Sequence, residues 1–352
     1  MTRGPVKRYV AGFATACLVG GVLAAFVAIA PAYAQDSSST ASTPAASSIV
    51  LGNSNSDTAV VTGDATFGSP TGSVTFYDCF AGAGPAPCSS QANQVGGSSV
   101  GLTGGASNTS SASSVSFTPT STGYWCFAAY YSGDSNYSTS NDSTTTDGCF
   151  DVTVASSSTT STPGAATIVI GNTNTDIASV VGNAAGGAPT GTVTFYYCYA
   201  GASPAPCTST LNKVGTGAVT LTTGANDTSS ATSAALHLAD TGYYCFGAYY
   251  SDSSNYAASS DTAVAECFDV VPPAPTITSF TPASGAPAST VKIFGTNLSG
   301  ATSVTFNGLA GTIKSDTGSE IKVKVPAAAH KGYIVVTTAG GSVQSATKFK
   351  VT

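Results

Sequence analysis

The sequence predicts an all-β protein, built as three tandem two-sheet sandwiches after an N-terminal signal peptide. Three observations carry this prediction. Many short runs, such as Val74–Tyr77 and Ile321–Val325, alternate between apolar and polar residues with period two and are separated by Gly, Pro, Asn and Ser. One long unit of the sequence occurs twice, and each copy contains four Cys. No stretch after residue 35 has a helical period, so helices are not expected.

Charged residues are scarce and unevenly placed along the chain. Only 8% of the 352 residues are charged, and 39 are Gly, a composition that favours strands and loops over helices with charged faces. Residues 35–274 contain fifteen acidic residues and one Lys, Lys213, whereas seven Lys follow in 275–352. Because phosphate binding needs clustered Lys or Arg, we expect no nucleic acid partner.

The first 34 residues have the pattern of an export signal. Three basic residues lie among the first eight, Val10–Ala30 is uncharged and mostly apolar, and Ala32-Tyr33-Ala34 supplies small residues for cleavage before Gln35. The apolar core is also long enough to span a bilayer, so a retained N-terminal anchor is the alternative. We expect an extracellular, secreted or envelope-associated protein, with no membrane span in the mature chain unless the signal is retained.

The internal repeat has an offset of 119 residues. Pro70–Tyr77 returns as Pro189–Tyr196, and Gly123–Phe127 returns as Gly242–Phe246. A unit of this length is a duplicated domain, because solenoid repeats have only about 20–50 residues. Its short alternating runs indicate about seven strands, which is typical of a two-sheet sandwich. The predicted divisions are a signal peptide (1–34), a Ser/Thr/Pro linker (35–47), repeat 1 (48–154), a linker (155–166), repeat 2 (167–272) and a C-terminal domain (273–352).

Alternation also predicts which side chains face the core of each repeat. Val74 and Phe76 are expected to face inward, with Tyr77 and Cys79 on the opposite face. For the strand at 124–131, the predicted inward set is Trp125, Phe127, Ala129 and Tyr131. The predicted outward set is Tyr124, Cys126, Ala128 and Tyr130, because the second copy tolerates Gly247 in that set.

Two motifs give the repeats a family resemblance. Pro70–Tyr77, followed by Ala129–Tyr137, resembles bacterial immunoglobulin-like repeats of extracellular proteins, and the likeness covers both copies. The second copy departs at its turn, where Ser253 replaces Asp134. The resemblance implies an immunoglobulin-like sandwich for each repeat.

The composition changes after the proline-rich hinge Val271–Pro275, because Cys vanishes and Lys appears. Runs such as Val291–Leu298 and Gly332–Thr338 make the span 273–352 resemble an IPT/TIG domain, another immunoglobulin-like sandwich. Some relatives of that family bind DNA, a role that the export signal and the acidic repeats argue against here. Lys322 and Lys324 are interpreted as a solvated strand face rather than an anion site.

Each repeat contains four Cys once Cys17 is removed with the signal. An even number in an exported chain indicates disulfides. Four Cys allow three pairings per repeat, and we favour one bond that closes the Ala/Gly/Pro loop and one between neighbouring final strands. These bonds are Cys79–Cys88 and Cys126–Cys149 in repeat 1, and Cys198–Cys207 and Cys245–Cys267 in repeat 2. Metal binding is the weaker alternative, because the sequence has no CxxC pair and two His.

The sequence contains no recognisable catalytic set or cofactor motif. His237 and His330 lie outside any GxSxG or HExxH context, and the mature chain has two Glu, Glu266 and Glu320. The Asp residues cluster in turns, where they serve backbone geometry. We therefore predict a protein that is not an enzyme and has no cofactor and no metal.

Two features are candidates for binding a partner. The acidic loop Ser132–Asp142 is either a weak calcium loop or a solvated turn. The second feature is a set of outward tyrosines, whose amphipathic rings suit carbohydrate or protein contact. The alternative for these rings is that they pack on one another and on the disulfides. The set is Tyr77, Tyr130 and Tyr137 in repeat 1, and Tyr196, Tyr249 and Tyr256 in repeat 2.

Together these features indicate a non-enzymatic extracellular or cell-surface modular protein for adhesion, spacing or recognition at a bacterial envelope. Its expected partner is an unidentified protein or glycan at the cell surface. Two alternatives stay open: a carbohydrate-binding accessory of secreted polysaccharide-degrading machinery, and a purely structural spacer. Fold likeness supplies most of this interpretation.

Overall fold

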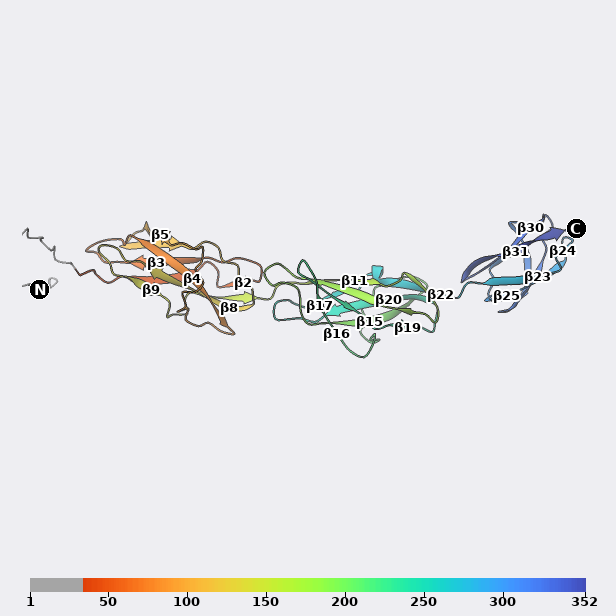
Figure 1. Ribbon diagram of the computed structural model, residues 1–352, viewed down its shortest axis with the longest axis horizontal. Helices are drawn as coiled ribbons and strands as arrows, with labels where there is room; N and C mark the ends of the chain where they lie inside the picture. The colour runs from red at the N-terminus through yellow and green to blue at the C-terminus, as the bar shows by residue number, and fades with distance from the viewer. Residues whose placement is uncertain (1–33) are drawn as a thin grey trace, which may run out of the picture.

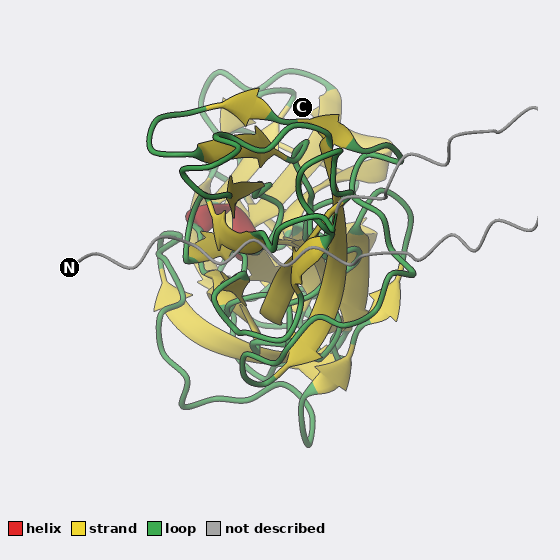
Figure 2. Cartoon of the chain, turned by 90° about the vertical axis from the view of Figure 1, so that its left-hand side faces the viewer, coloured by secondary structure: helices red, strands yellow, loops and turns green. Residues whose placement is uncertain are grey.

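The computed structural model describes residues 34–352, and this part of the chain is all-β, as the sequence predicts. Three sandwiches, each with two main sheets, follow one another along the molecule (Figure 1). In the described residues the strands and loops are interrupted by a single helical turn, the 3-10 helix η1 (Val264–Glu266), visible in Figure 2. The predicted export signal lies outside the described residues except for Ala34.

Repeat 1 packs a four-stranded sheet, in the order β1-β3-β7-β6, against a six-stranded sheet, in the order β2-β10-β8-β4-β5 with β9 paired to β8. Neighbouring strands are antiparallel, except that β2 runs parallel to β10. The strands are β1 (Ser39–Pro44), β2 (Ser48–Val50), β3 (Asp57–Thr62), β4 (Ser73–Gly82), β5 (Val100–Gly101), β6 (Thr103–Gly104), β7 (Thr109–Ser113), β8 (Gly123–Tyr131), β9 (Ser140–Asp142) and β10 (Cys149–Thr153).

Repeat 2 has the same topology, with sheets β11-β14-β18-β17 and β12-β22-β20-β15-β16, β21 paired to β20, and a small extra sheet of β13 and β19. Its strands are β11 (Ser158–Pro163), β12 (Thr167–Val169), β13 (Thr173–Asn174), β14 (Asp176–Val181), β15 (Thr192–Gly201), β16 (Val219–Thr220), β17 (Thr222–Thr223), β18 (Thr228–Thr232), β19 (Leu236–His237), β20 (Gly242–Tyr250), β21 (Ser259–Asp261) and β22 (Cys267–Val271).

The C-terminal domain pairs a sheet in the order β23-β25-β29-β28 with one in the order β24-β31-β30-β26-β27. Its buried cluster is separate from that of the repeats. Its strands are β23 (Thr276–Thr281), β24 (Ser284–Gly285), β25 (Thr290–Thr296), β26 (Ser303–Phe306), β27 (Leu309–Ala310), β28 (Thr312–Asp316), β29 (Glu320–Lys324), β30 (Gly332–Thr338) and β31 (Gly341–Val351).

The two segments predicted as Ser/Thr/Pro linkers contain strands, which corrects the predicted divisions at 35–47 and 155–166. β1 pairs with β3 along its whole length, and β11 pairs with β14 in the same register. Both are edge strands whose last residue is Pro, a position where the missing N–H costs no ladder bond. The alternation pattern does not predict these strands, because hydroxyl side chains such as the buried Ser42 stand where an ordinary strand has apolar residues.

Both faces of the larger sheet in repeat 1 are covered. The predicted inward set is correct, since Phe127, Ala129 and Tyr131 are buried in the core and Trp125 packs against it. The opposite face was expected to be outward, yet Cys126 and Ala128 are buried there too, in a small cluster with Cys88. The loop closed by the Cys79–Cys88 bond supplies that cover.

Repeat 1 and repeat 2 contact each other through one buried apolar side chain and two hydrogen bonds. Leu51, 2% exposed, lies so close to Gly186 that a Cβ there would sit 2.8 Å from its Cδ2. Asn183 Nδ2 donates to Leu51 O at 3.0 Å, and Thr122 Oγ1 donates to Ser254 O at 2.6 Å. The buried cores of the two repeats form one continuous cluster, so this junction fixes one repeat on the other.

Replacing Asn183 by Asp is expected to loosen this junction. The Asp carboxylate has no donor to offer Leu51 O, so the contact turns from a hydrogen bond into a repulsion that costs about 1–3 kcal/mol. Small-angle X-ray scattering of the mature chain should then show a broader distribution of interatomic distances. The reverse change at the equivalent place in repeat 1, Asp64→Asn, is the control and should leave the scattering unchanged. Identical scattering from Asn183→Asp and the native chain would show that this bond does not hold the junction.

Candidate functional site

The outward tyrosines that stay accessible form one edge-to-face pair in each repeat. The rings of Tyr77 (β4) and Tyr130 (β8) have centroids 5.5 Å apart at 89°, and Tyr196 and Tyr249 repeat this geometry in repeat 2. All four rings are half-buried. Tyr249 Oη donates to the carbonyl oxygen of Thr208, the residue that follows the disulfide loop, at 3.3 Å. Each pair therefore packs internally and against its loop, with part of the ring surface left to solvent.

Tyr137 and Tyr256 do not belong to this face, and their predicted place on it is wrong. Their exposed fractions are 0% and 1%. Tyr137 Oη donates to Gly68 O at 2.7 Å and accepts from Asp64 N at 3.0 Å, and Tyr256 makes the same contacts with the matching loop of repeat 2. Each ring thus closes one end of its sandwich, an arrangement that period-two alternation does not reveal because both residues lie in turns.

Four disulfides link the cysteines in the pairing that the sequence favours: Cys79–Cys88, Cys126–Cys149, Cys198–Cys207 and Cys245–Cys267. In repeat 1, Cys126 stands directly opposite Cys79 on one neighbouring strand and opposite Cys149 on the other. Repeat 2 has the same row. One bond of each repeat joins two strands of the larger sheet, and the other fastens the loop that covers it.

The acidic loop of repeat 1 is a turn held by its own aspartate. Asp134 Oδ2 accepts from Thr71 N at 2.6 Å and from Thr71 Oγ1, and its Oδ1 accepts from Asn136 N at 2.7 Å and Tyr137 N at 2.8 Å. Partial burial raises the pKa of Asp134, but these hydrogen bonds outweigh it and lower the pKa to about 2. The carboxylate oxygens are already engaged by the protein, which favours the solvated turn over a calcium loop.

Each repeat buries carboxyl groups that the sequence analysis did not single out. Asp57 has an exposed fraction of 0%, and neither carboxyl oxygen has a hydrogen-bond partner. Burial raises the pKa of Asp57 to about 7, and the nearby charge of Asp142 adds to the effect. Burial raises the pKa of Asp176 to about 6 and that of Glu266 to about 7 in repeat 2. The sequence gives one sign of these buried carboxyl groups: both repeats have Asp at the same position, the first residue of β3 and of β14.

An exposed aromatic residue stands at the same position in both repeats. Phe80, near the end of β4, is 54% exposed, and Tyr199, near the end of β15, is 59% exposed. Phe80 lies beside Trp125 with centroids 5.2 Å apart, and Tyr199 lies beside Tyr244 at 5.0 Å. Period-two alternation places these two residues on the inward face and gives no sign of their exposure, although the 119-residue offset aligns them.

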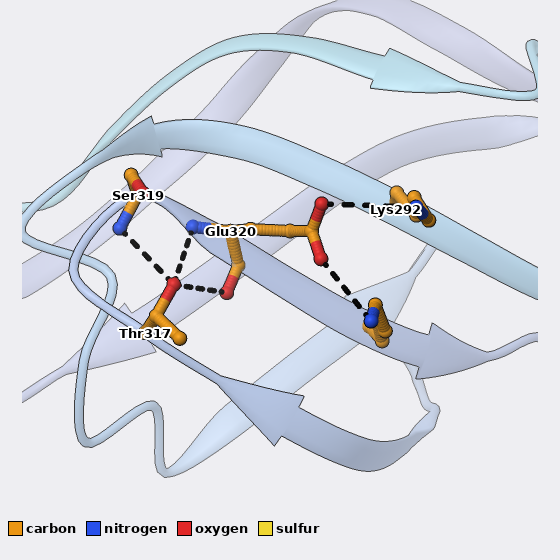
Figure 3. A network of polar contacts seen from close by, with 5 residues as sticks. Lys292, Thr317, Ser319 and Glu320 are labelled. Atoms are coloured by element: carbon orange, nitrogen blue, oxygen red, sulfur yellow. Dashed lines mark hydrogen bonds and ion pairs between the residues drawn. The ribbon is translucent and has the colours of Figure 1, made fainter.

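The C-terminal domain contains the two ion pairs of the described residues, and both use Glu320 (Figure 3). Its Oε2 lies 3.9 Å from Lys292 Nζ, and its Oε1 lies 3.5 Å from Lys322 Nζ. Lys292 and Lys322 are direct partners on β25 and β29. Because one carboxylate lies between two partly exposed ammonium groups and offsets part of their charge, this face is a solvated strand surface rather than an anion site.

Over residues 34–352, no group of three or more His, Cys, Asp or Glu side chains is arranged to hold a metal ion. The same part of the chain includes no helix with the length and apolar character needed to cross a membrane.

Similarity to solved structures is broad and distant. The chain resembles invasin, a bacterial integrin-binding protein, at 14% identity over 85% of this chain and 56% of that chain, with a TM-score of 0.42. It resembles FdeC, an Escherichia coli adhesin, at 15% identity over 91% and 99% of the two chains, with a TM-score of 0.30. It also resembles SGBP-B from a xyloglucan utilization locus in Bacteroides uniformis, at 16% identity over 56% and 50%, with a TM-score of 0.23.

The chain covers only about half of the length of invasin and SGBP-B. None of the curated proteins compared with the sequence matches it. A family match covers the end of the chain, over the same span in which the alternating runs and the hinge point to a separate domain. The C-terminal part of this all-β protein, residues 275–351, is a member of the IPT/TIG domain family.

Proposed function

We propose that this is a non-enzymatic extracellular or cell-surface protein that serves adhesion, spacing or recognition at a bacterial envelope. The observation that carries the proposal is the pair of disulfide-fastened sandwiches in contact end to end. Disulfides persist in oxidising surroundings outside the cytosol. Two repeats that share one continuous core make an extended body suited to holding a binding surface away from its anchor.

The composition of the repeats supports the same role. A sparsely charged, acidic surface with one Lys suits contact with neutral or basic partners and opposes polyanions. Asp57, Asp176 and Glu266, whose pKa values are raised the most, are buried inside the sandwiches rather than placed in a cleft where a substrate could reach them.

Cell fractionation combined with N-terminal sequencing and non-reducing peptide mapping tests the location. We expect a mature chain that starts at Gln35, in the secreted or envelope fraction, with all four disulfides formed. Recovery of the chain from the cytoplasm with free thiols would contradict the proposal. Saturable attachment of beads coated with residues 35–352 to cell surfaces would then separate adhesion from a purely structural spacer, which binds nothing.

A second candidate function is a carbohydrate-binding accessory that uses the tyrosine pairs. It is supported by the part of Tyr77, Tyr130, Tyr196 and Tyr249 that stays open to solvent in both repeats. Pull-down on insoluble polysaccharides tests it. Loss of binding in a Tyr130→Ala/Tyr249→Ala variant would support the tyrosine pairs as the binding site. Unchanged binding in that variant would exclude them as the site.

A further inference from the structure

The strongest unexplained surface feature of the repeats is the exposed ring at the end of β4 and β15. The strand β4 is bulged between Phe80 and Gly82, and β15 is bulged between Tyr199 and Gly201. A bulge re-aims side chains and is common near binding sites. Both rings are more than half exposed, so neither ring serves mainly to fill the core.

Glycines on the partner strand make room for each ring. A Cβ on Gly123 would lie 3.3 Å from the Phe80 ring and 2.7 Å from Gly82 O. A Cβ on Gly242 would lie 3.1 Å from the Tyr199 ring. Both glycines have positive φ values, +106° and +122°. A side chain at either glycine would therefore crowd the backbone carbonyl opposite it and the exposed ring.

A second aromatic ring supports each exposed one. Trp125 stands directly opposite Phe80, is tilted by 54° to it, and is fixed by its Nε1, which donates to Ser121 O at 3.0 Å. Tyr244 stands opposite Tyr199 with a tilt of 50°. We use the name aromatic platform for each pair, Phe80 with Trp125 and Tyr199 with Tyr244.

We propose that the two aromatic platforms bind the sugar rings of a neutral polysaccharide. This inference rests on the recognition role proposed above and names its ligand class. An exposed, supported aromatic ring offers the flat apolar surface on which the C–H face of a sugar ring stacks. Two platforms at equivalent positions of adjoining repeats suit a polymer that repeats one unit, because the second contact becomes intramolecular.

Charge selects a neutral chain over an anionic one. The described part of repeat 1 contains no Lys, Arg or His, and repeat 2 contains Lys213 and His237 against its acidic residues. An anionic polymer would be repelled by this acidic surface and would find no cation cluster to pair with. The platforms themselves consist of apolar rings and two phenol groups, which need no counter-ion.

Co-sedimentation of the mature chain, residues 35–352, with cellulose, chitin and starch granules tests the proposal, with soluble polygalacturonate as an anionic polymer in a gel-shift arm. We expect saturable binding to at least one neutral polymer and none to polygalacturonate. Phe80→Ala or Tyr199→Ala alone should weaken binding at least about tenfold, because one lost platform removes the avidity. The double variant should not bind measurably.

Matched variants separate the platforms from general surface effects. Phe80→Tyr and Tyr199→Phe keep an aromatic ring and should keep the binding. Phe67→Ala/Leu211→Ala removes two other exposed apolar side chains, 48% and 88% exposed, and should bind like the native chain. Far-UV circular dichroism checks that every variant is folded.

The proposal is overturned if none of the three neutral polymers binds, if only polygalacturonate binds, or if the double variant binds as well as the native chain. Loss of binding in Tyr130→Ala/Tyr249→Ala with unchanged binding in the platform variants would also overturn it and would favour the tyrosine pairs. Because fractionation tests the surface location independently, failure of the platforms leaves the proposed surface role standing.

Discussion

Repeat 1 is expected to be more stable at about pH 4 than at about pH 8, by up to about 4 kcal/mol in its free energy of unfolding. The cause is Asp57, whose pKa is about 7 in the folded chain against an ordinary value of 3.8. A raised pKa means that the folded state binds the proton more tightly than the unfolded state. The resulting stability is fully present below about pH 3.8 and is lost as the pH rises through about 7.

Asp134 responds in the opposite direction and in a different window. Its pKa is lowered to about 2, so the stability it contributes is present above its ordinary pKa and is lost only as the pH falls through about 2. Above about pH 5 it stays charged in the folded and unfolded chain alike. The slope above about pH 5 therefore reports the buried carboxyl groups of repeat 1, Asp57 with its large shift and Asp78, whose pKa burial also raises.

The variant Asp57→Asn should abolish most of this slope and raise the stability of repeat 1 at about pH 8. An amide keeps the volume of the side chain and places no charge in the buried site, where burial outweighs the polar groups of Ser42, Thr43 and Thr58. The chain has one Trp, Trp125 in β8, so its fluorescence during urea unfolding follows repeat 1. The control is Asp176→Asn in repeat 2, which should change the Trp125 transition less than Asp57→Asn does. A native transition with no change of midpoint between the two pH values would contradict the assignment.

The periodicity and the duplication of the sequence predict much of the architecture. Val74, Phe76 and Phe127 face the core because β-branched and aromatic residues alternate with smaller or polar ones along β4 and β8. The pairing of Cys126 with Cys149 follows from the order of neighbouring strands near the end of each repeat. The C-terminal domain was recognisable from its own alternating runs, because no cysteine and no disulfide loop interrupts them.

What the sequence did not predict depends on contacts between distant residues. Period two cannot identify β1 as a strand when its buried side is made of hydroxyl groups, since those side chains are found equally in linkers. It cannot show that Tyr137 turns into the end of the sandwich, because a turn residue has no fixed face. The exposure of Phe80 depends on the bulge and on Gly123 of the partner strand, a conjunction of elements more than forty residues apart.

The burial of Asp57 has a similar origin. A lone Asp at the start of β3 reads as a turn residue, but the neighbouring edge strand β1 closes over it once the hydroxyl-rich segment pairs with β3. The strand that the sequence did not predict, β1, is thus also one that shields the Asp57 carboxyl group from solvent. The two errors of the sequence analysis have one physical cause.

Removing the Cys126–Cys149 bond is expected to lower the free energy of unfolding of repeat 1 by about 3 kcal/mol, the entropy of closing a loop of this length in the unfolded chain. The two residues are separated by 23 positions, and the bond joins β8 to β10 in the larger sheet. The variant Cys126→Ala/Cys149→Ala leaves both strands and their ladder in place. Urea unfolding followed by the fluorescence of Trp125, the neighbour of Cys126 in β8, should therefore show a single transition at a lower urea concentration.

The equivalent variant in repeat 2, Cys245→Ala/Cys267→Ala, is the matched control for this loss. It removes a bond of nearly the same span, 22 positions, from a sheet that contains no Trp. If the bond acts on the unfolded chain of its own repeat, the Trp125 transition stays where it is in the native protein. A Trp125 midpoint that moves equally in both variants would mean that the shared core at Leu51 makes the two repeats unfold as one unit. A midpoint that moves in neither would show that the disulfide adds nothing to the stability of the sheet.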